Sequence, residues 1–453
     1  MGRRALLFGL GAVAAACIAC TAILGDFQPT ADTRTDGGDG GGSDAPADSS
    51  DAGPLSGFLA TSVSAGAHHT CGVRDGRVYC WGRDLSGQLG QSPSSYPNGA
   101  DHPVKISALG QAGGNKAIIA VAAGYNHTCA LDGEGSVFCW GLNDRGQLGD
   151  PLVTVDTLPH PQPTQVVQVG SKDGFLHNVT TIAAGEGHTC ATTSSTVFCW
   201  GDNTYAQSGG DLAFAGLYSA AHDIGGNFAG AVLAVTAGPK HTCASTGTTS
   251  TCWGTQMLGE LGLNADGGPP RVTVGGATTP TNPTGGADVG AIGAGEQHTC
   301  AQTTSGTIFG AACWGDNTFG QVGASNAAGS FYTPTAVADL SGVDSVVTGA
   351  SYSCARLKDK TVACWGTNIL GQLGQGTTLP GMRVNPAPKP VASLVGVTAL
   401  AAGFDHACAI VSSKAAGGGG AGQVFCWGAG ANNQLGIGPN LENQSTPKLV
   451  NSD

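Results

Sequence analysis

The chain has 453 residues, a formal net charge of −12 and only 11% charged residues, whereas glycine alone occupies 76 positions. This composition favours many short strands joined by tight turns over long, charged helices. No cluster of basic residues follows Arg4, so nucleic acid binding, which needs an electropositive surface, is not expected.

The N-terminal segment has the pattern of an export signal. Arg3 and Arg4 precede an uncharged apolar run over residues 5–25. Its end, AAACIACTAILGD, resembles a bacterial lipoprotein cleavage box, for which we favour Cys20 as the lipid-bearing residue, with Cys17 as the alternative. An uncleaved membrane anchor is the other interpretation, because the run is long enough to span a bilayer. Each interpretation exports the remaining chain to the cell envelope or cell surface.

An acidic linker is predicted to follow the signal. Residues 26–57 contain seven Asp and one Arg among mostly Gly, Ser, Ala, Thr and Pro. Such a segment buries too little apolar surface to fold, and its like charges repel one another. We therefore assign residues 1–20 to the signal and residues 21–57 to a disordered tether.

From residue 58 to residue 453 the chain repeats one motif seven times. The first copy, AGAHHTCGVRDGRVYCWGRDLSGQLG, spans residues 65–90, and the second, AGYNHTCALDGEGSVFCWGLNDRGQLG, spans residues 123–149. Each copy holds one of the seven tryptophans: Trp81, Trp140, Trp200, Trp253, Trp314, Trp365 and Trp427. A repeat period of this length indicates a solenoid or a propeller and favours one closed domain.

The fourteen cysteines beyond the signal form seven pairs, two cysteines per copy. A hairpin about Asp75-Gly76, a favoured two-residue turn, places Cys71 opposite Cys80 at a non-hydrogen-bonded position. The Cα atoms of such a pair lie about 4.5 Å apart, within disulfide reach. In an exported chain we predict seven cross-strand disulfides. The predicted pairs are Cys71–Cys80, Cys129–Cys139, Cys190–Cys199, Cys243–Cys252, Cys300–Cys313, Cys354–Cys364 and Cys408–Cys426.

Zinc binding is the alternative use of these cysteines, since most copies also carry a histidine, such as His127 beside Cys129 and Cys139. Zinc sites usually have shorter Cys spacings and four ligands. In the sixth copy Tyr352 replaces the histidine although both cysteines remain. We therefore predict disulfides, with no metal and no cofactor.

Each copy is expected to supply about four antiparallel strands, which make one blade. A short apolar strand precedes the two motif strands, as at residues 117–124, 179–185 and 397–403. In most copies a proline-led segment follows them, at residues 103–106, 163–167, 334–337 and 447–450. Proline suits an outer edge strand, where its missing N–H costs nothing.

The motif resembles the repeat of the regulator-of-chromosome-condensation family. The shared features are the Ala-Gly-x-x-His-x-x-Ala strand, the Trp-Gly pair and the Gly-Gln-Leu-Gly turn. The third copy (WGDNTYAQSGG) and the fourth (WGTQMLGELG) depart from the final turn. The resemblance implies an all-β, seven-bladed propeller, here with one disulfide in each blade. The additional cysteines fit an exported bacterial branch of the family.

Residues that recur in nearly every copy are expected to serve folding. We expect the tryptophans to pack between blades. The motif histidines should donate hydrogen bonds that pin neighbouring strands: His69, His127, His188, His241, His298 and His406. Asparagines before the turns should bond their own backbone: Asn143, Asn203, Asn317 and Asn368. Function should then lie in what differs between copies.

No catalytic motif is found. The sequence lacks a G-x-S-x-G elbow, an H-E-x-x-H helix motif and a G-x-x-x-x-G-K-[ST] phosphate loop. Carboxylates from separate blades could still converge in the fold. We predict that the protein is not an enzyme.

Three classes of function remain. The first is a monomeric, membrane-tethered module that binds a protein or glycan; by resemblance, secreted family members include an inhibitor of β-lactamases. The second is guanine-nucleotide exchange on a small GTPase, the founding activity of the family, which the export signal, the disulfides and the acidic tether disfavour. The third is a cell-surface hydrolase or lyase.

The segments after the last glycine of each motif vary in length and chemistry. They leave the blades at equivalent points, so we expect several to gather on one face. Aromatic side chains on exposed loops are favoured anchors for partners. The candidate binding residues are Tyr96, Phe214, Tyr218, Phe331 and Tyr332.

Overall fold

The computed structural model describes the region from residue 57 to residue 452 except for several loops: residues 110–115, 210–215, 226–227, 229, 248, 263–288, 304–309, 325–328, 379–384 and 413–420. The signal, Cys17, Cys20 and nearly all of the tether lie outside the described residues. Within the described part, no helix is long and apolar enough to cross a membrane.

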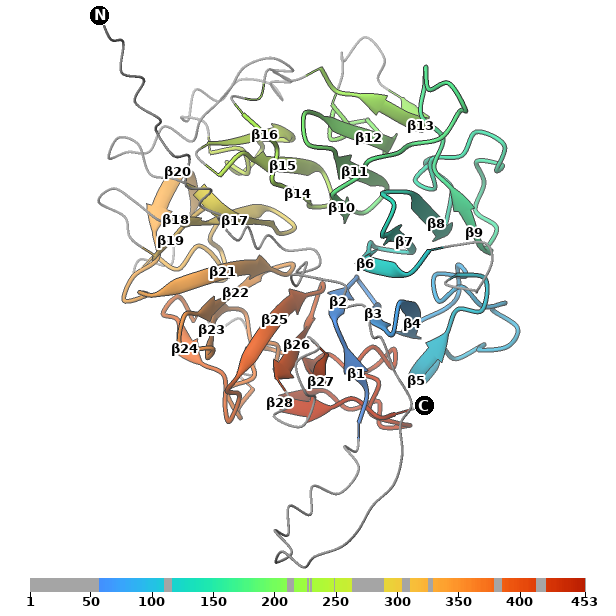
Figure 1. The fold of residues 1–453 in the computed structure, drawn as a ribbon. Helices are drawn as coiled ribbons and strands as arrows, with labels where there is room; N and C mark the ends of the chain where they lie inside the picture. The colour runs from blue at the N-terminus through green and yellow to red at the C-terminus, as the bar shows by residue number, and fades with distance from the viewer. Residues whose placement is uncertain are drawn as a thin grey trace, which may run out of the picture.

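In the part of the chain that the structure describes, twenty-eight strands form seven antiparallel sheets, which stand as blades around one axis (Figure 1). Blade 1 contains β2 (Ser62–Ala65), β3 (His69–Arg74), β4 (Arg77–Gly82) and β5 (Ala100–Lys105). Blade 2 contains β6 (Ile118–Ala123), β7 (His127–Asp132), β8 (Val137–Gly141) and β9 (His160–Gln165). Blade 3 contains β10 (Thr181–Ala184), β11 (His188–Thr192), β12 (Val197–Asp202) and β13 (Leu217–Asp223). Blade 4 contains β14 (Ala234–Ala237), β15 (His241–Ser245) and β16 (Ser250–Gly254).

The remaining three blades follow the same plan. Blade 5 contains β17 (Val289–Ala294), β18 (His298–Thr303), β19 (Gly310–Asp316) and β20 (Ser330–Ala336). Blade 6 contains β21 (Val343–Thr348), β22 (Tyr352–Leu357), β23 (Val362–Gly366) and β24 (Lys389–Pro390). Blade 7 contains β25 (Val397–Ala402), β26 (His406–Ser412), β27 (Gly422–Gly428) and β28 (Gln444–Leu449), joined by β1 (Leu59–Ala60). The predicted seven-bladed propeller is confirmed; in blade 4 the described residues give three strands.

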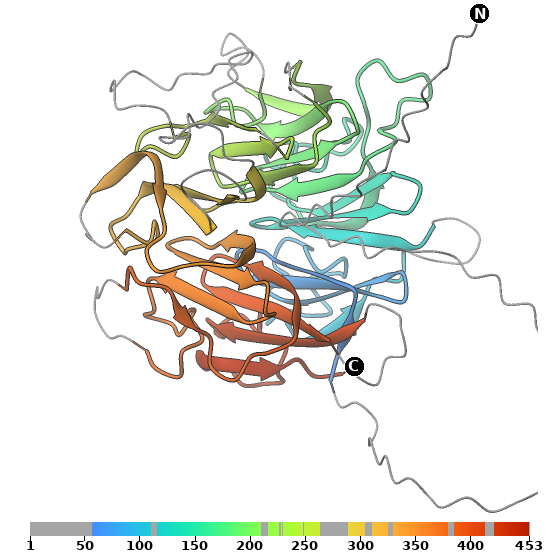
Figure 2. The ribbon, with the colours of Figure 1, turned by 60° about the vertical axis from the view of Figure 1, so that its left-hand side comes forward.

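The ring closes because the start and the end of the domain share blade 7. Both β1 and β28 pair with β27, so the blue first strand lies beside the red last blade (Figures 1 and 2). The Phe58 amide donates to the Val450 carbonyl at 2.9 Å, and the Val424 amide donates to the Phe58 carbonyl at 3.0 Å. The Phe58 ring is fully buried and meets Tyr79 and Trp81 edge to face, at centroid distances of 5.3 and 5.6 Å. Phe58 therefore ties the last blade to the first.

The outer strands begin three or four residues earlier than the sequence pattern predicts, so their prolines lie inside the strand. In blade 1 the register with β4 shifts between Cys80 and Gly82, which face Val104 and Ala100. Pro103 falls in this irregular stretch, where the ladder is already interrupted. A bulge tolerates the missing N–H of proline as well as a free edge does.

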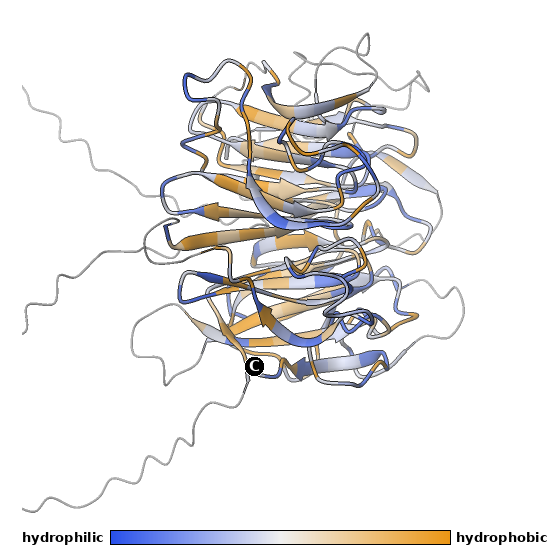
Figure 3. Ribbon diagram, turned by 90° about the vertical axis from the view of Figure 1, so that its right-hand side faces the viewer, coloured by the Kyte–Doolittle hydropathy of each residue, from blue (hydrophilic) through white to orange (hydrophobic). Residues whose placement is uncertain are grey.

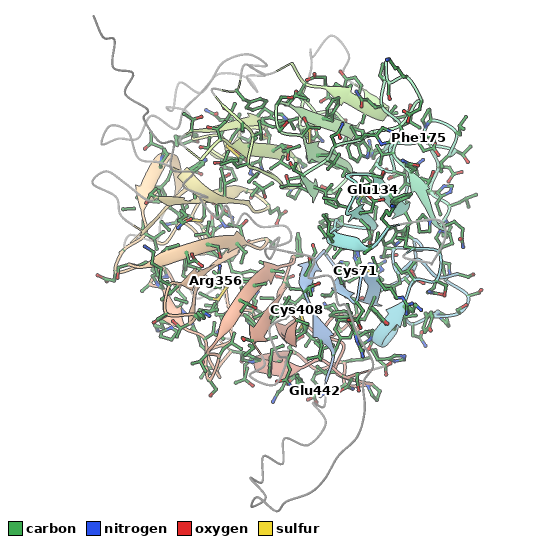
Figure 4. All side chains as sticks on the ribbon, viewed as in Figure 1. Cys71, Glu134, Phe175, Arg356, Cys408 and Glu442 are labelled. Atoms are coloured by element: carbon green, nitrogen blue, oxygen red, sulfur yellow. A yellow bond between two sulfur atoms is a disulfide. The ribbon has the colours of Figure 1, made fainter. Side chains whose placement is uncertain are left out.

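The motif hairpins have the predicted register. Asp75 and Gly76 form the turn with φ angles of 51° and 69°, the left-handed conformation of a type I′ turn. Cys71 then pairs with Cys80 across β3 and β4. All seven predicted disulfides are present, one in each blade, with Cα–Cα distances of 4.0 to 4.1 Å. Figure 4 labels Cys71 in blade 1 and Cys408 in blade 7, both well inside the ring.

A circle of hydrogen bonds joins each blade to the next, through the motif histidine at six junctions, as predicted, and through the Tyr352 hydroxyl, which donates to the His406 carbonyl, between blades 6 and 7. Between blades 1 and 2, the Trp140 Nε1–H and the Thr128 hydroxyl both donate to the Gln88 carbonyl, at 2.9 and 2.8 Å. The Thr128 oxygen can then accept from His69 Nε2–H at 2.8 Å. Burial lowers the pKa of His69 to about 3, so the ring is neutral. The same contact recurs in the pairs His127–Thr189, His188–Thr242, His241–Thr299, His298–Ser353 and His406–Thr70.

The apolar core consists of separate clusters that lie between neighbouring blades. Trp140 of blade 2, for example, packs with Leu89 and Ile106 of blade 1. Six of the tryptophans rank among the largest fully buried side chains. Figure 3 shows the apolar colouring concentrated on the strands and the hydrophilic colouring on the turns at their ends. The recurring residues are thus used for packing and ring closure.

The first copy departs from this plan by placing a buried carboxyl group where the second copy has an asparagine. In blade 2 Asn143 accepts from the Leu148 amide at 3.1 Å, and its amide group donates to the Thr154 carbonyl at 2.9 Å. In blade 1 the equivalent residue is Asp84, which accepts from the Leu89 amide at 2.9 Å. Its second oxygen is buried and has no hydrogen-bond partner within the described residues. Burial raises the pKa of Asp84 to about 7.

We expect Asp84→Asn to stabilise the protein at alkaline pH. Because the raised pKa favours the protonated acid in the folded state, the wild type should lose stability as pH rises from about 4 to about 7. The variant lacks this loss and should be more stable at pH 8 by about 2–4 kcal/mol. Urea unfolding at pH 5 and pH 8 measures the difference. The exposed Asp75→Asn in the same blade is the control, and an equal pH dependence in wild type and Asp84→Asn would contradict the expectation.

Candidate binding site at the channel mouth

The aromatic candidates from the sequence are half-buried rather than exposed. Tyr96 packs against the cluster between blades 1 and 2. Tyr218 lies on β13 and stacks on His222 at 3.6 Å, whereas Phe331 and Tyr332 lie on β20. They occupy strand positions because the outer strands begin earlier than expected. Phe214 lies outside the described residues, and partner binding by this set stays a prediction.

The innermost strands surround a narrow axial channel. They are β2, β6, β10, β14, β17, β21 and β25, one from each blade. The cavity between them has a volume of about 110 Å³ and is lined by alanine, serine, threonine, glycine, valine and leucine. Small side chains are required here because seven strands converge on one axis. No charged side chain lines this part of the channel in the described residues.

At one end of the channel, the turns between the first and second strands of all blades meet around a shallow mouth of about 100 Å³. Each turn holds two residues between the motif glycine and the motif histidine, which is Tyr352 in blade 6, and the first residue of each pair lines the mouth. These pairs are Ala67-His68, Tyr125-Asn126, Glu186-Gly187, Pro239-Lys240, Glu296-Gln297, Ala350-Ser351 and Phe404-Asp405. The mouth is therefore built from the most variable positions inside an otherwise constant motif.

One side of the mouth is aromatic. Tyr125 and Phe404 meet edge to face with their centroids 5.5 Å apart, and His68 meets Tyr125 at 6.2 Å. Burial, followed by the nearby Arg83, lowers the pKa of His68, so this ring is neutral at pH 7. Phe404 of blade 7 and Tyr125 of blade 2 line the mouth, and we call these two rings the aromatic wall. His68 of blade 1 contacts Tyr125 beside it.

Carboxylates of blades 3 and 5, Glu186 and Glu296, line the mouth, and Asp405 of blade 7 lies near Glu296. Burial and then Glu186 raise the pKa of Glu296. Burial, with a further contribution from Glu296, raises the pKa of Asp405 to about 6. None of these three groups forms an ion pair within the described residues, and Lys240 lies instead over the Tyr205 ring at 4.9 Å from its centroid. Lys240 is still near enough to lower the pKa of Glu296, so the negative charge of the mouth is offset in part but not paired.

A larger groove lies next to the mouth on the same face. It has a volume of about 410 Å³ and runs over blades 2, 3 and 4. Tyr125, Glu186 and Lys240 belong to its lining, which continues outward over Asp144 and Tyr205. Mouth and groove form one concave surface, which we call the mouth face.

Sequence reasoning did not single out the mouth residues. The signal was present as variation of two residues between constant ones, in the Ala-Gly-x-x-His step. Variation at two positions does not by itself show that the seven turns meet around one axis. Within the described residues, no group of three His, Cys, Asp or Glu side chains could hold a metal ion.

The chain forms a closed propeller whose variable turns meet in a concave surface at one end of the axis. Profiles of the regulator of chromosome condensation (RCC1) repeat match the chain at residues 60–88, 118–147 and 179–207, and a second profile of the same repeat matches residues 75–131, 134–192, 361–410 and 421–453. The chain belongs to this RCC1 repeat family.

Similar proteins have diverse roles. The chain is 28% identical over 410 residues to the ultraviolet-B receptor UVR8 of Arabidopsis thaliana, covering 86% of this chain and 81% of the receptor. It is 27% identical to the human E3 ubiquitin-protein ligase HERC2, but spans only 7% of that protein. Yeast RCC1 (Prp20) bound to Kap60 has the same fold, with a TM-score of 0.67, 22% identity and 83% coverage of each chain. Human WBSCR16 also has this fold, with a TM-score of 0.66 and 21% identity. The match covers 84% of this chain and 94% of the WBSCR16 chain.

Proposed function

We propose that this protein is an exported binding module that holds a partner protein against its mouth face. The main support for the proposal is that the constant and the variable residues of the motif have different positions in the fold. The constant residues form the core and the circle of hydrogen bonds, whereas the variable pairs gather at the mouth beside a groove of about 410 Å³. Clefts lined by apolar surface with a few placed polar groups are the usual sites of recognition.

Export is proposed from the chemistry of the cysteines and the N-terminal sequence. Disulfides persist in oxidising compartments and are rare in reducing ones, and every blade contains one. The proposed lipid anchor at Cys20 would tether the propeller to a membrane. Cys20→Ala should release the native protein from the membrane fraction, whereas release only by Cys17→Ala would move the site.

Site-specific photo-cross-linking in the native envelope tests the binding face. A photo-reactive amino acid at Lys240 should give a discrete cross-linked partner, because this exposed residue lines the groove. The same amino acid at Lys116, which is exposed near the opposite ends of the strands, is the matched control. Equal products from both positions, or a product only from Lys116, would contradict the proposal.

A hydrolase is the second candidate, favoured by one observation. Asp405 and Glu296 are neighbouring carboxyl groups from different blades, and burial raises the pKa of Asp405 to about 6, a value suited to a general acid. If the protein is a hydrolase, Asp405→Asn should abolish turnover of a cell-wall glycan substrate by the native protein while the melting temperature stays unchanged. The hypothesis of guanine-nucleotide exchange is supported by family membership alone. The rate of GDP release from a small GTPase in the presence of the protein tests it directly.

A further inference from the structure

We propose that the channel mouth receives one cationic side chain, an arginine or a lysine of the partner protein, between its aromatic wall and its carboxylates. The wall consists of Tyr125 and Phe404, and the carboxylates are those of Glu186, Glu296 and Asp405. This inference rests on the proposed function, since it specifies the chemistry of the partner on the mouth face.

The aromatic wall favours a cation over a neutral group of the same shape. The electron-rich face of an aromatic ring attracts an ammonium or guanidinium group within about 6 Å of its centroid. Tyr125 and Phe404 are half-buried and line the mouth cavity, so each keeps part of its ring surface toward the opening. The edge-to-face contact between them fixes their orientation before anything binds.

The carboxylates supply the complementary charge. Glu186 and Glu296 line the mouth from blades 3 and 5, and the neighbouring Asp405 comes from blade 7. Burial raises the pKa of Tyr125 to about 12, and the nearness of these three carboxylates adds to the rise. The same negative field would stabilise a cation at this position.

Nearby cations of the protein form no ion pair with these carboxylates, although Lys240 acts on Glu296 from a distance. Lys240 lies over the Tyr205 ring in the groove, and Arg83 stands beside His68 on the aromatic side. A bound cation would therefore meet carboxylates that have no ion-pair partner within the described residues. An arginine would add stacking and two parallel hydrogen bonds, which makes it the stronger fit of the two side chains.

The dimensions set the size of the occupant. A mouth of about 100 Å³ takes the head of one side chain, and the apolar and hydroxyl-lined channel below offers no charged group. The cationic head therefore stays at the mouth, while the backbone that carries it would lie over the groove of about 410 Å³.

Titration with small probes tests the inference without the partner. We expect N-acetyl-arginine amide to bind the intact propeller saturably, with a Kd on the order of 1–10 mM by NMR or calorimetry. N-acetyl-lysine amide is the second cationic probe, and the tighter of the two identifies the side chain. N-acetyl-citrulline amide has nearly the shape of the arginine probe without its charge, and it should not bind saturably.

Variants locate the binding. Glu186→Gln with Glu296→Gln should weaken binding of the arginine probe at least about fivefold, as expected for loss of about 1 kcal/mol. Glu134→Gln is the matched control and should bind as the wild type does, because Glu134 lies in the turn between β7 and β8, at the other end of β7 from the mouth. If the double variant has a lower melting temperature than the wild type, the titration is repeated with Glu186→Gln alone. Glu186 is exposed, so this substitution should leave the fold intact.

Three results would overturn the inference: no saturable binding of either cation, equal binding of citrulline, or full affinity in the Glu186→Gln variants. Because the titration contains no partner protein, such a failure leaves the cross-linking result at Lys240 standing. Loss of that cross-link would instead remove the proposed function itself.

Discussion

Gly124→Ala should destabilise the propeller by about 3 kcal/mol or more, because the new methyl group has no space. A Cβ atom at Gly124 would lie 2.5 Å from Cε1 of His127 and 2.7 Å from the carbonyl oxygen of Gly185 in the next blade. The first contact displaces the ring that bonds Thr189, and the second pushes two blades apart. Thermal and urea unfolding measure the loss.

Gly133→Ala is the control for this prediction. Gly133 belongs to the same blade, and a methyl group there would meet its nearest neighbour, the carbonyl oxygen of Ala117, at an ordinary contact distance of 3.7 Å. Its φ angle is not positive, so alanine adopts it without strain. A stability loss of similar size at both positions would show that crowding at the Ala-Gly step is not the cause.

Phe58→Ala should cost about 3–5 kcal/mol, the range for removing a buried aromatic side chain. The ring is fully buried, and it contacts both Tyr79 and Trp81 of blade 1 from a segment that pairs with blade 7. Its loss leaves a cavity where the ring closes. Urea unfolding measures the cost, and limited proteolysis should show earlier cleavage near the joined ends.

Phe175→Ala provides the comparison, because this phenylalanine is 37% exposed on the molecular surface. Its removal should change stability by less than about 1 kcal/mol. If Phe58→Ala were equally mild, closure would depend on the backbone pairing of β1 and β28 with β27 and not on the Phe58 ring.

The turn residues and the repeated motif were sufficient to predict the strands, the hairpins and the disulfides of each blade. The turn at Asp75-Gly76 determines the register of its hairpin by itself, so the pairing of Cys71 with Cys80 followed from counting residues. The repeated motif indicated one blade per copy, and the recurrence of His, Trp and Gly indicated residues used for folding. These features are local in sequence or repeated, which is why one chain revealed them.

Contacts that join distant parts of the chain were decided only by the tertiary structure. The sequence does not show that Tyr125, Glu296 and Phe404 are neighbours. Ring closure brings them together although as many as 279 residues of chain separate them. The bulge that accommodates Pro103 and the burial of the second Asp84 oxygen, which has no hydrogen-bond partner within the described residues, likewise depend on neighbouring strands and loops. The sequence determined the blade and the number of blades. Circular closure places one variable turn from every blade around the same axis, and it thereby created the concave surface at which we propose that a partner binds.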